Sequence, residues 1–142
     1  MYIFGIIQQR IKKMIKALKN IEFEDVIVDK VTSIYDGDTF RVNIKGYPKI
    51  IGHRMSVRIL GIDTPEIRTN CKKEKDLARS AKKLTISLLR GAKLIELRNI
   101  KRGKYFRILA DVYVDNISIA DELIKNNLAV SYDGGTKIDW CK

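Results

Sequence analysis

Residues 26–44 read VIVDKVTSIYDGDTFRVNI, and this stretch decides the fold. Residues 26–34 are rich in β-branched side chains, which favour a strand. Asp36-Gly37 is typical of a tight turn, and apolar side chains then alternate with polar ones along residues 39–45. Two strand-like segments on either side of a turn predict a β-hairpin.

The elements downstream of the hairpin complete a recognisable order. Residues 54–62 predict a third strand, and residues 93–98 and 107–114 predict two more. Between them, apolar side chains recur at helical spacing and predict a helix that ends near Gly91; they are Leu77, Ala81, Leu84 and Leu88. Ser118 followed by Asp121 resembles a capping box, which predicts a short helix through residue 127.

Three strands, a helix, two strands and a helix is the order of a five-stranded OB-fold barrel. We therefore expect an α+β protein: an antiparallel five-stranded β-barrel with a helix after strand 3 and a short helix after strand 5. Strands and helices do not alternate as a parallel α/β sheet requires. OB-fold barrels bind oligonucleotides on one face and through nearby loops.

The first 20 residues differ from the rest of the chain. They carry basic residues and no acidic ones, and Ile7, Ile11, Met14 and Leu18 recur at helical spacing. We expect two units, a basic amphipathic helix in residues 1–21 and the barrel domain in residues 22–142. The helix either packs its apolar face on the domain or lies on an anionic membrane surface. Because the apolar run precedes the charges and is too short to span a bilayer, we expect a cytoplasmic location.

Composition narrows the function classes. The chain has 142 residues, enough for one packed domain, and a formal net charge of +11, which favours binding to nucleic acid or to an anionic membrane. His53 is the only histidine, so a catalytic triad of the Ser-His or Cys-His type would have to use this one residue and is not favoured. Cys71 and Cys141 are far apart, and we expect free thiols, with a single bridge as the alternative. No obligate protein partner is evident.

Two short acidic motifs stand out in this basic chain. Residues 36–39 read DGDT and residues 63–66 read DTPE, each beside a predicted strand. Each motif is also ordinary turn chemistry. If the two strands are neighbours, however, Asp38 and Asp63 face one point, with the backbone carbonyl of Thr64 nearby. Such hard oxygen ligands suit Ca²⁺ or Mg²⁺ rather than zinc or copper.

Arginines complete a set of groups that could act on a phosphate. Arg58 precedes Asp63 on the same predicted strand, and Arg107 opens the last strand. A guanidinium grips phosphate oxygens bidentately and keeps its charge, although each arginine could also be a solvated strand residue. Together with Glu66 as a carboxylate base, these residues are suited to metal-assisted hydrolysis of a phosphodiester.

Three motifs carry a family resemblance: VTSIYDGDTFRV (31–42), VRILGIDTPEIR (57–68) and KYFRILADVYV (104–114). In this order and at these intervals they resemble the staphylococcal nuclease (thermonuclease) family. The resemblance implies an OB-fold barrel and Ca²⁺-dependent hydrolysis of DNA and RNA that leaves 3′-phosphate ends.

The resemblance also implies roles for single residues. Asp38, Asp63 and the carbonyl of Thr64 would ligate calcium, and Asp36 would support them. Glu66 would lie beside the attacking water, and Arg58 and Arg107 would contact the scissile phosphate. Nucleotide-contacting side chains would be Lys104, Tyr105 and, more loosely, Tyr132, for which packing is the alternative role, as it is for Trp140.

Two departures from the family pattern are visible. The family motif D-K-Y-G-R is replaced by Gly103-Lys104-Tyr105-Phe106-Arg107, which could reshape the loop that aims Arg107. The long final helix of typical members has no counterpart here, and we expect residues 1–20 to cover the barrel surface that it would bury.

We therefore expect a metal-dependent endonuclease that cleaves DNA, RNA or both with little sequence specificity. Calcium is the expected cofactor, and Mg²⁺ or Mn²⁺ would suit the same oxygen ligands. The alternative is a non-catalytic OB-fold module that binds nucleic acid.

Overall fold

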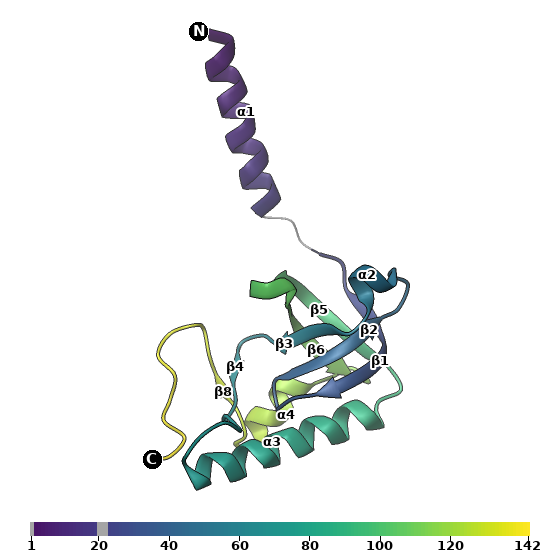
Figure 1. Cartoon of the computed structure of the whole chain (residues 1–142), viewed down its shortest axis with the longest axis vertical. Helices are drawn as coiled ribbons and strands as arrows, with labels where there is room; N and C mark the ends of the chain where they lie inside the picture. Colours follow the sequence, from purple (N-terminus) through teal and green to yellow (C-terminus); the bar gives the residue numbers. More distant parts are fainter. Residues whose placement is uncertain (1, 20–22) are drawn as a thin grey trace.

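Five strands form a closed barrel at the centre of the structure, a computed structural model that describes residues 2–19 and 23–142 (Figure 1). The strands lie in the order β3-β2-β1-β5-β6, and a pairing between β3 and β6 closes the ring. Their bounds are β1 (Val26–Ile34), β2 (Thr39–Ile44), β3 (Met55–Ile59), β5 (Ile95–Arg102) and β6 (Ile108–Val114). A short strand, β7 (Ile117–Ser118), extends the sheet beyond β6. The predicted barrel is confirmed.

The pairing that closes the barrel corrects one detail of the prediction. All neighbouring strands are antiparallel except β3 and β6, which are parallel. Strict alternation of strand direction around a ring requires an even number of strands. A ring of five must therefore contain one parallel pair, and here the pair joins the two strands that flank α3 (Lys72–Gly91) and β5 in sequence.

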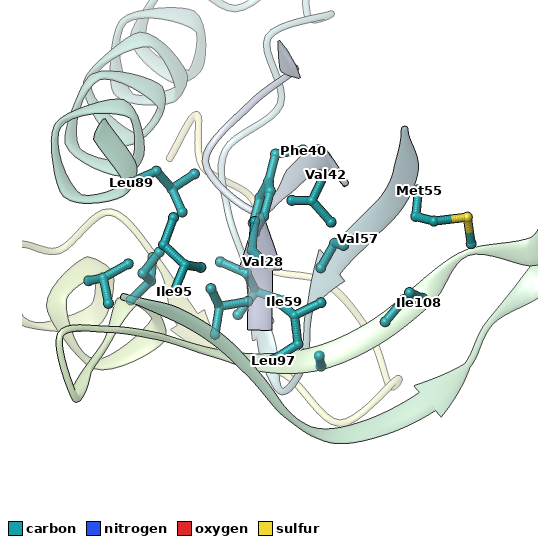
Figure 2. Packing of buried hydrophobic residues seen from close by; sticks show 14 of the residues in the cluster. Val28, Phe40, Val42, Met55, Val57, Ile59, Leu89, Ile95, Leu97 and Ile108 are labelled. Carbon is teal, nitrogen blue, oxygen red and sulfur yellow. The ribbon is translucent and has the colours of Figure 1, made fainter. Parts of the chain in front are cut away.

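Alternating side chains build the core. Along β2, β3 and β6 every second residue is buried, so the strands present one apolar face to the barrel interior. Figure 2 shows Phe40, Val42, Val57, Ile59 and Leu97 converging there. The predicted helix is present as α3, but its buried face is Ala78, Ala81, Thr85 and Leu89. The predicted leucines Leu84 and Leu88 flank that face and are only partly buried.

The remaining elements are short. The Ser118 cap of the predicted capping box is confirmed, because the Ser118 hydroxyl accepts a hydrogen bond from Asp121 N (3.2 Å). The helix that it opens, α4 (Ile119–Lys125), ends two residues before the predicted residue 127. The sequence did not predict α2 (Lys49–Gly52) or the turn η1 (Lys104–Phe106). Beyond Gly61, whose φ is 76°, β4 (Ile62–Asp63) leaves β3 and pairs instead with β8 (Val130–Ser131).

A disulfide joins Cys71 to Cys141, so the prediction of free thiols was wrong. The two cysteines are 70 residues apart in sequence, and only the fold brings the end of the chain to the first turn of α3. Disulfides persist in oxidising compartments and are rare in the cytosol. The bridge therefore gives no support to the expected cytoplasmic location, which stays a prediction.

The N-terminal helix is present as α1 (Tyr2–Lys19), but it does not cover the barrel. It stands clear of the other elements (Figure 1), and residues 3–14 are all exposed, including the apolar Ile7, Ile11 and Met14. The expected packing on the domain was therefore wrong for these residues. The side chain of Leu18 and the predicted boundary at residue 21 lie outside the described residues. Among the helices described, none is long and apolar enough to cross a membrane.

Candidate active site

The turn between β1 and β2 holds the first two carboxylates in place. Asp36 accepts a hydrogen bond from the backbone N–H of Asp38 (3.2 Å), and the Asp38 carboxylate accepts one from the Thr39 hydroxyl (3.0 Å). The Thr85 hydroxyl of α3 donates to the Gly37 carbonyl (2.7 Å). Both carboxylates are buried, so the turn is fixed by packing rather than left in solvent.

Arg58 of β3 lies beside this turn. Its Nε is 3.7 Å from Asp38 Oδ2, and the backbone N–H of the following residue, Ile59, donates to the Asp38 carbonyl (2.9 Å). Thr39 pairs with Arg58 in the β2–β3 ladder, which explains why the arginine and the aspartate meet. The Arg58 side chain is 30% exposed, so it can still reach a ligand in solvent.

The second acidic motif packs against the first. A Cβ built on Gly37 would lie 3.5 Å from Thr64 Cγ2 and 2.9 Å from Ala81 Cβ, so the turn is wedged between the DTPE segment and α3. Asp63 and Thr64 are each only 3% exposed. Only glycine fits at position 37 without displacing the turn. The structure thus brings DGDT and DTPE together, as the sequence predicted for neighbouring strands.

The charges of these carboxylates interact. Burial, together with a hydrogen bond to Asp38 and the negative charge of that residue, raises the pKa of Asp36 from 3.8 to about 7, and Glu66 contributes in the same direction. A concentration of buried negative charge of this kind favours a bound cation.

Asp63 and Glu66 already have a positive partner from the end of the chain. The Lys137 ammonium is 3.5 Å from Asp63 Oδ1 and 3.9 Å from Glu66 Oε1. Trp140 Nε1 donates a hydrogen bond to Asp63 Oδ2 (3.3 Å). Glu66 is otherwise held through its backbone N–H, which donates to the Glu74 carboxylate (3.1 Å), so its own carboxylate stays exposed to solvent.

Register places Arg107 on the same face as Arg58. Val57 pairs with Ile108 and Arg58 with Leu109 in the parallel β3–β6 ladder. Because Val57 and Ile108 both point into the core, Arg58 and Arg107 point to the outer face, where side chains alternate. The two arginines thus belong to one outer surface, and Arg58 is the one in contact with the turn that carries Asp38.

The loop before Arg107 accommodates the departure from the family motif. Tyr105 and Phe106 both have positive φ (57° and 66°), a conformation that L residues other than Asn and Asp adopt at a cost. Arg102 offsets part of this cost: Nη1 donates to the Phe106 carbonyl (3.0 Å), and the guanidinium lies 4.3 Å from the centre of the Phe106 ring.

The expected nucleotide-contacting residues divide into two groups. Lys104 is exposed, and Tyr105 next to it in the η1 turn is 98% exposed. Tyr132 lies on the other side, and its ring centre is 5.7 Å from Lys137 Nζ. Tyr132 is therefore linked to the carboxylates through Lys137, whereas Tyr105 projects into solvent.

The donor set limits which metal the site could hold. Across residues 2–19 and 23–142, no three acidic, histidine or cysteine side chains form a ready metal cluster. Asp38 and Asp63 supply two carboxylates, and the next residue, Thr64, offers a backbone carbonyl. An oxygen-only set with few protein ligands fits a hard divalent cation that keeps part of its water shell.

The sequence missed the contribution of the C-terminal segment. Lys137 and Trp140 contact Asp63, although nothing in their local pattern indicated it. The one available signal was the pair of cysteines, because a bridge from Cys71 to Cys141 carries Trp140 to the start of α3.

Comparisons with known proteins agree with this architecture. A family described as staphylococcal nuclease homologue matches residues 56–138, more than half of the chain. The SPbeta prophage-derived endonuclease YokF of Bacillus subtilis (strain 168) is 36% identical over 110 residues, 76% of this chain and 34% of YokF. Endonuclease YncB of the same organism is 35% identical over 96 residues, 66% of this chain and 43% of YncB. The chain thus spans less than half the length of either relative.

Proposed function

Because this chain belongs to the staphylococcal nuclease family, we propose that it is a phosphodiester hydrolase that cleaves nucleic acid. The two Bacillus relatives are named endonucleases, which supports the proposal. We further propose that a divalent cation, calcium by preference, is required, and that DNA, RNA or both are cut with little sequence specificity to leave 3′-phosphate ends.

One observation carries the proposal: the two acidic motifs and Arg58 meet at one place. Gly37 packs against Thr64, and Arg58 lies 3.7 Å from Asp38. Buried carboxylates without a functional role are costly to keep, whereas carboxylates beside an arginine are suited to metal-dependent hydrolysis of a phosphodiester, which supports the proposal.

The proposed metal ligands are Asp38, Asp63 and the carbonyl of Thr64. The ammonium of Lys137 beside Asp63 supports the view that this position attracts positive charge. A bound divalent cation would supply Lewis-acid polarisation of the phosphate and would lower the pKa of a bound water. Calcium suits these oxygen donors, as do Mg²⁺ and Mn²⁺. Cleavage assays with each ion in turn show which of them the protein uses.

The other proposed roles belong to the protein's own side chains. The Glu66 carboxylate accepts a proton from a water molecule while the oxygen of that water forms a bond to phosphorus. Arg58 and Arg107 donate hydrogen bonds to the phosphate oxygens and offset the charge that develops there. The bond from phosphorus to the 5′ oxygen then breaks, the 5′ oxygen takes up a proton from solvent to become a hydroxyl, and the phosphate stays on the 3′ side.

Substrate binding follows from charge. The net charge of +11 attracts any polyanion, and no element of the site offers a pattern that reads a base sequence. Lys104, Tyr105 and Tyr132 are the proposed nucleotide contacts, the lysine for phosphate and the tyrosines for stacking on bases.

The proposal is tested by incubating denatured DNA, and separately RNA, with the protein in calcium, magnesium, manganese or EDTA. Asp63→Asn tests the metal ligand, and Asp76→Asn on the outer surface of α3 is the matched control for loss of one carboxylate. We expect calcium-dependent cleavage by the wild type and by Asp76→Asn, with loss in Asp63→Asn. Salt-sensitive binding without cleavage in any metal would instead identify a binding module.

A further inference from the structure

The last ten residues fold back over the site. Figure 1 shows the C-terminal segment leaving β8 and returning to the start of α3. There Lys137 contacts Asp63 and Glu66, Trp140 donates to Asp63, and the Lys73 ammonium donates to the Lys142 carbonyl (2.8 Å). The Cys71–Cys141 bridge fixes the segment to α3.

These contacts fall on two residues to which we assign the metal and the water. Asp63 is buried, and a buried carboxylate needs a hydrogen bond or a positive partner. Trp140 supplies the hydrogen bond and Lys137 the charge. A cation bound to Asp63 would compete for both positions.

The disulfide strengthens this competition. Lys137 is only four residues from Cys141, so the bridge keeps its ammonium at a high local concentration near Asp63. Without the bridge, residues 133–142 would lose more conformational entropy when they settle against Asp63, because nothing would restrain them beforehand. The oxidised chain therefore holds Lys137 at the carboxylates more firmly than the reduced chain.

We propose that residues 133–142 are a tethered strap: its Lys137 ammonium neutralises Asp63 and Glu66, and so competes with the divalent cation for Asp63 until that cation displaces it. Lys137 and Trp140 are positioning residues, because they act on the carboxylates and not on the substrate. This inference rests on the proposed function, since it takes Asp63 as a metal ligand.

The test measures calcium affinity by calorimetry on the full chain, together with the fluorescence of Trp140, the only tryptophan. Calcium is expected to change the Trp140 emission of the wild type. Lys137→Met should bind calcium about two- to fivefold more tightly, the range for loss of a competing exposed ion pair. Lys137→Arg, which keeps the charge, should resemble the wild type, and so should Lys125→Met at the end of α4, which removes an equal charge elsewhere.

The bridge is tested with the double variant Cys71→Ser/Cys141→Ser, in which serine can still cap α3. It should bind calcium as tightly as Lys137→Met, and dithiothreitol should have the same effect on the wild type only. Equal affinity in wild type, Lys137→Met and the double variant would overturn the strap. Weaker binding in Lys137→Met would also overturn it. A wild type that binds no calcium would refute the proposed metal site itself, which is a distinguishable result.

A second inference comes from α1, whose residues 3–14 are all exposed. On this helix Ile3, Phe4, Ile7, Ile11 and Met14 share one face, and each is at least 45% exposed. Arg10, Lys12 and Lys13 lie on other faces or at the edge, and residues 1–20 include no acidic side chain.

Anionic lipid is the partner that matches both faces at once. The apolar face would enter the acyl boundary while the basic side chains stay among the headgroups. A nucleic acid would satisfy only the basic face, and a second copy of the helix would bring like charges together. We infer that α1 lies on anionic bilayers and attaches the domain to their surface.

Sedimentation with vesicles of phosphatidylglycerol and phosphatidylcholine tests this inference, with pure phosphatidylcholine as the neutral comparison. Ile7→Glu adds a charge to the apolar face, and Gln9→Glu adds the same charge to the opposite face. We expect Ile7→Glu to bind on the order of tenfold more weakly than Gln9→Glu, because it alone loses apolar burial.

Equal binding by the two variants, or equal binding to neutral vesicles, would overturn the inference. A wild type that self-associates in analytical ultracentrifugation but ignores vesicles would assign the apolar face to a second copy instead.

Discussion

Replacing Thr85 with valine should loosen the turn that carries Asp36 and Asp38. The Thr85 side chain is fully buried, and its hydroxyl donates to the Gly37 carbonyl at 2.7 Å. Valine has a similar shape but no donor, so the buried carbonyl loses its partner. Such a loss costs about 1–3 kcal/mol of unfolding free energy. Urea unfolding followed by circular dichroism measures it, and calorimetry should show weaker calcium binding as well.

Thr32→Val is the matched control for this prediction. Thr32 Oγ1 is buried in β1 and has no hydrogen-bond partner among the described residues. Valine at this strand position removes an unsatisfied group and should leave stability unchanged or raise it. If the two variants lost equal stability, the hydrogen bond to Gly37 would not be what anchors the turn, and our account of how α3 positions the site would be refuted.

Three further results are expected. Arg58→Lys should lower kcat on the order of 10²-fold, because an ammonium cannot reproduce a bidentate grip on phosphate; near-normal turnover would exclude that role. Arg102→Ala removes the hydrogen bond to the Phe106 carbonyl and the contact with its ring, so kcat should fall while the melting temperature changes little. An unaltered kcat would show that the conformation of this loop does not orient Arg107. Affinity for single-stranded DNA, measured by fluorescence anisotropy, should fall steeply with added salt; a flat profile would contradict the electrostatic account of binding.

Local patterns in the sequence were enough to predict the barrel. The hairpin at Asp36-Gly37, the alternation along β2 and β3, and the Ser118 cap each depend on residues a few positions apart. The meeting of DGDT and DTPE followed from the expectation that their strands are neighbours, and the contact between Gly37 and Thr64 confirms it.

The errors came from contacts between distant parts of the chain. The Cys71–Cys141 bridge and the contact of Lys137 with Asp63 join residues about 70 apart, and no local rule specifies such pairs. The apolar stripe of α1 was read correctly as helical, but amphipathicity does not say what covers the apolar face. The buried face of α3 was also predicted incorrectly, apart from Ala81. It includes the small side chains of Ala78, Ala81 and Thr85, because the Gly37 turn comes close to the helix there.

The role of Glu66 tests the central claim most directly. Single-turnover cleavage of a short single-stranded oligonucleotide should be measured in calcium, at about 10 mM to saturate even a weak site, with binding measured in parallel. Glu66→Gln is compared with Glu122→Gln at a half-buried position of α4. We predict that Glu66→Gln cleaves on the order of 10²–10⁴-fold more slowly, with binding retained, while Glu122→Gln matches the wild type. Wild-type cleavage rates in Glu66→Gln would contradict the account of this site as a carboxylate-assisted, metal-dependent nuclease.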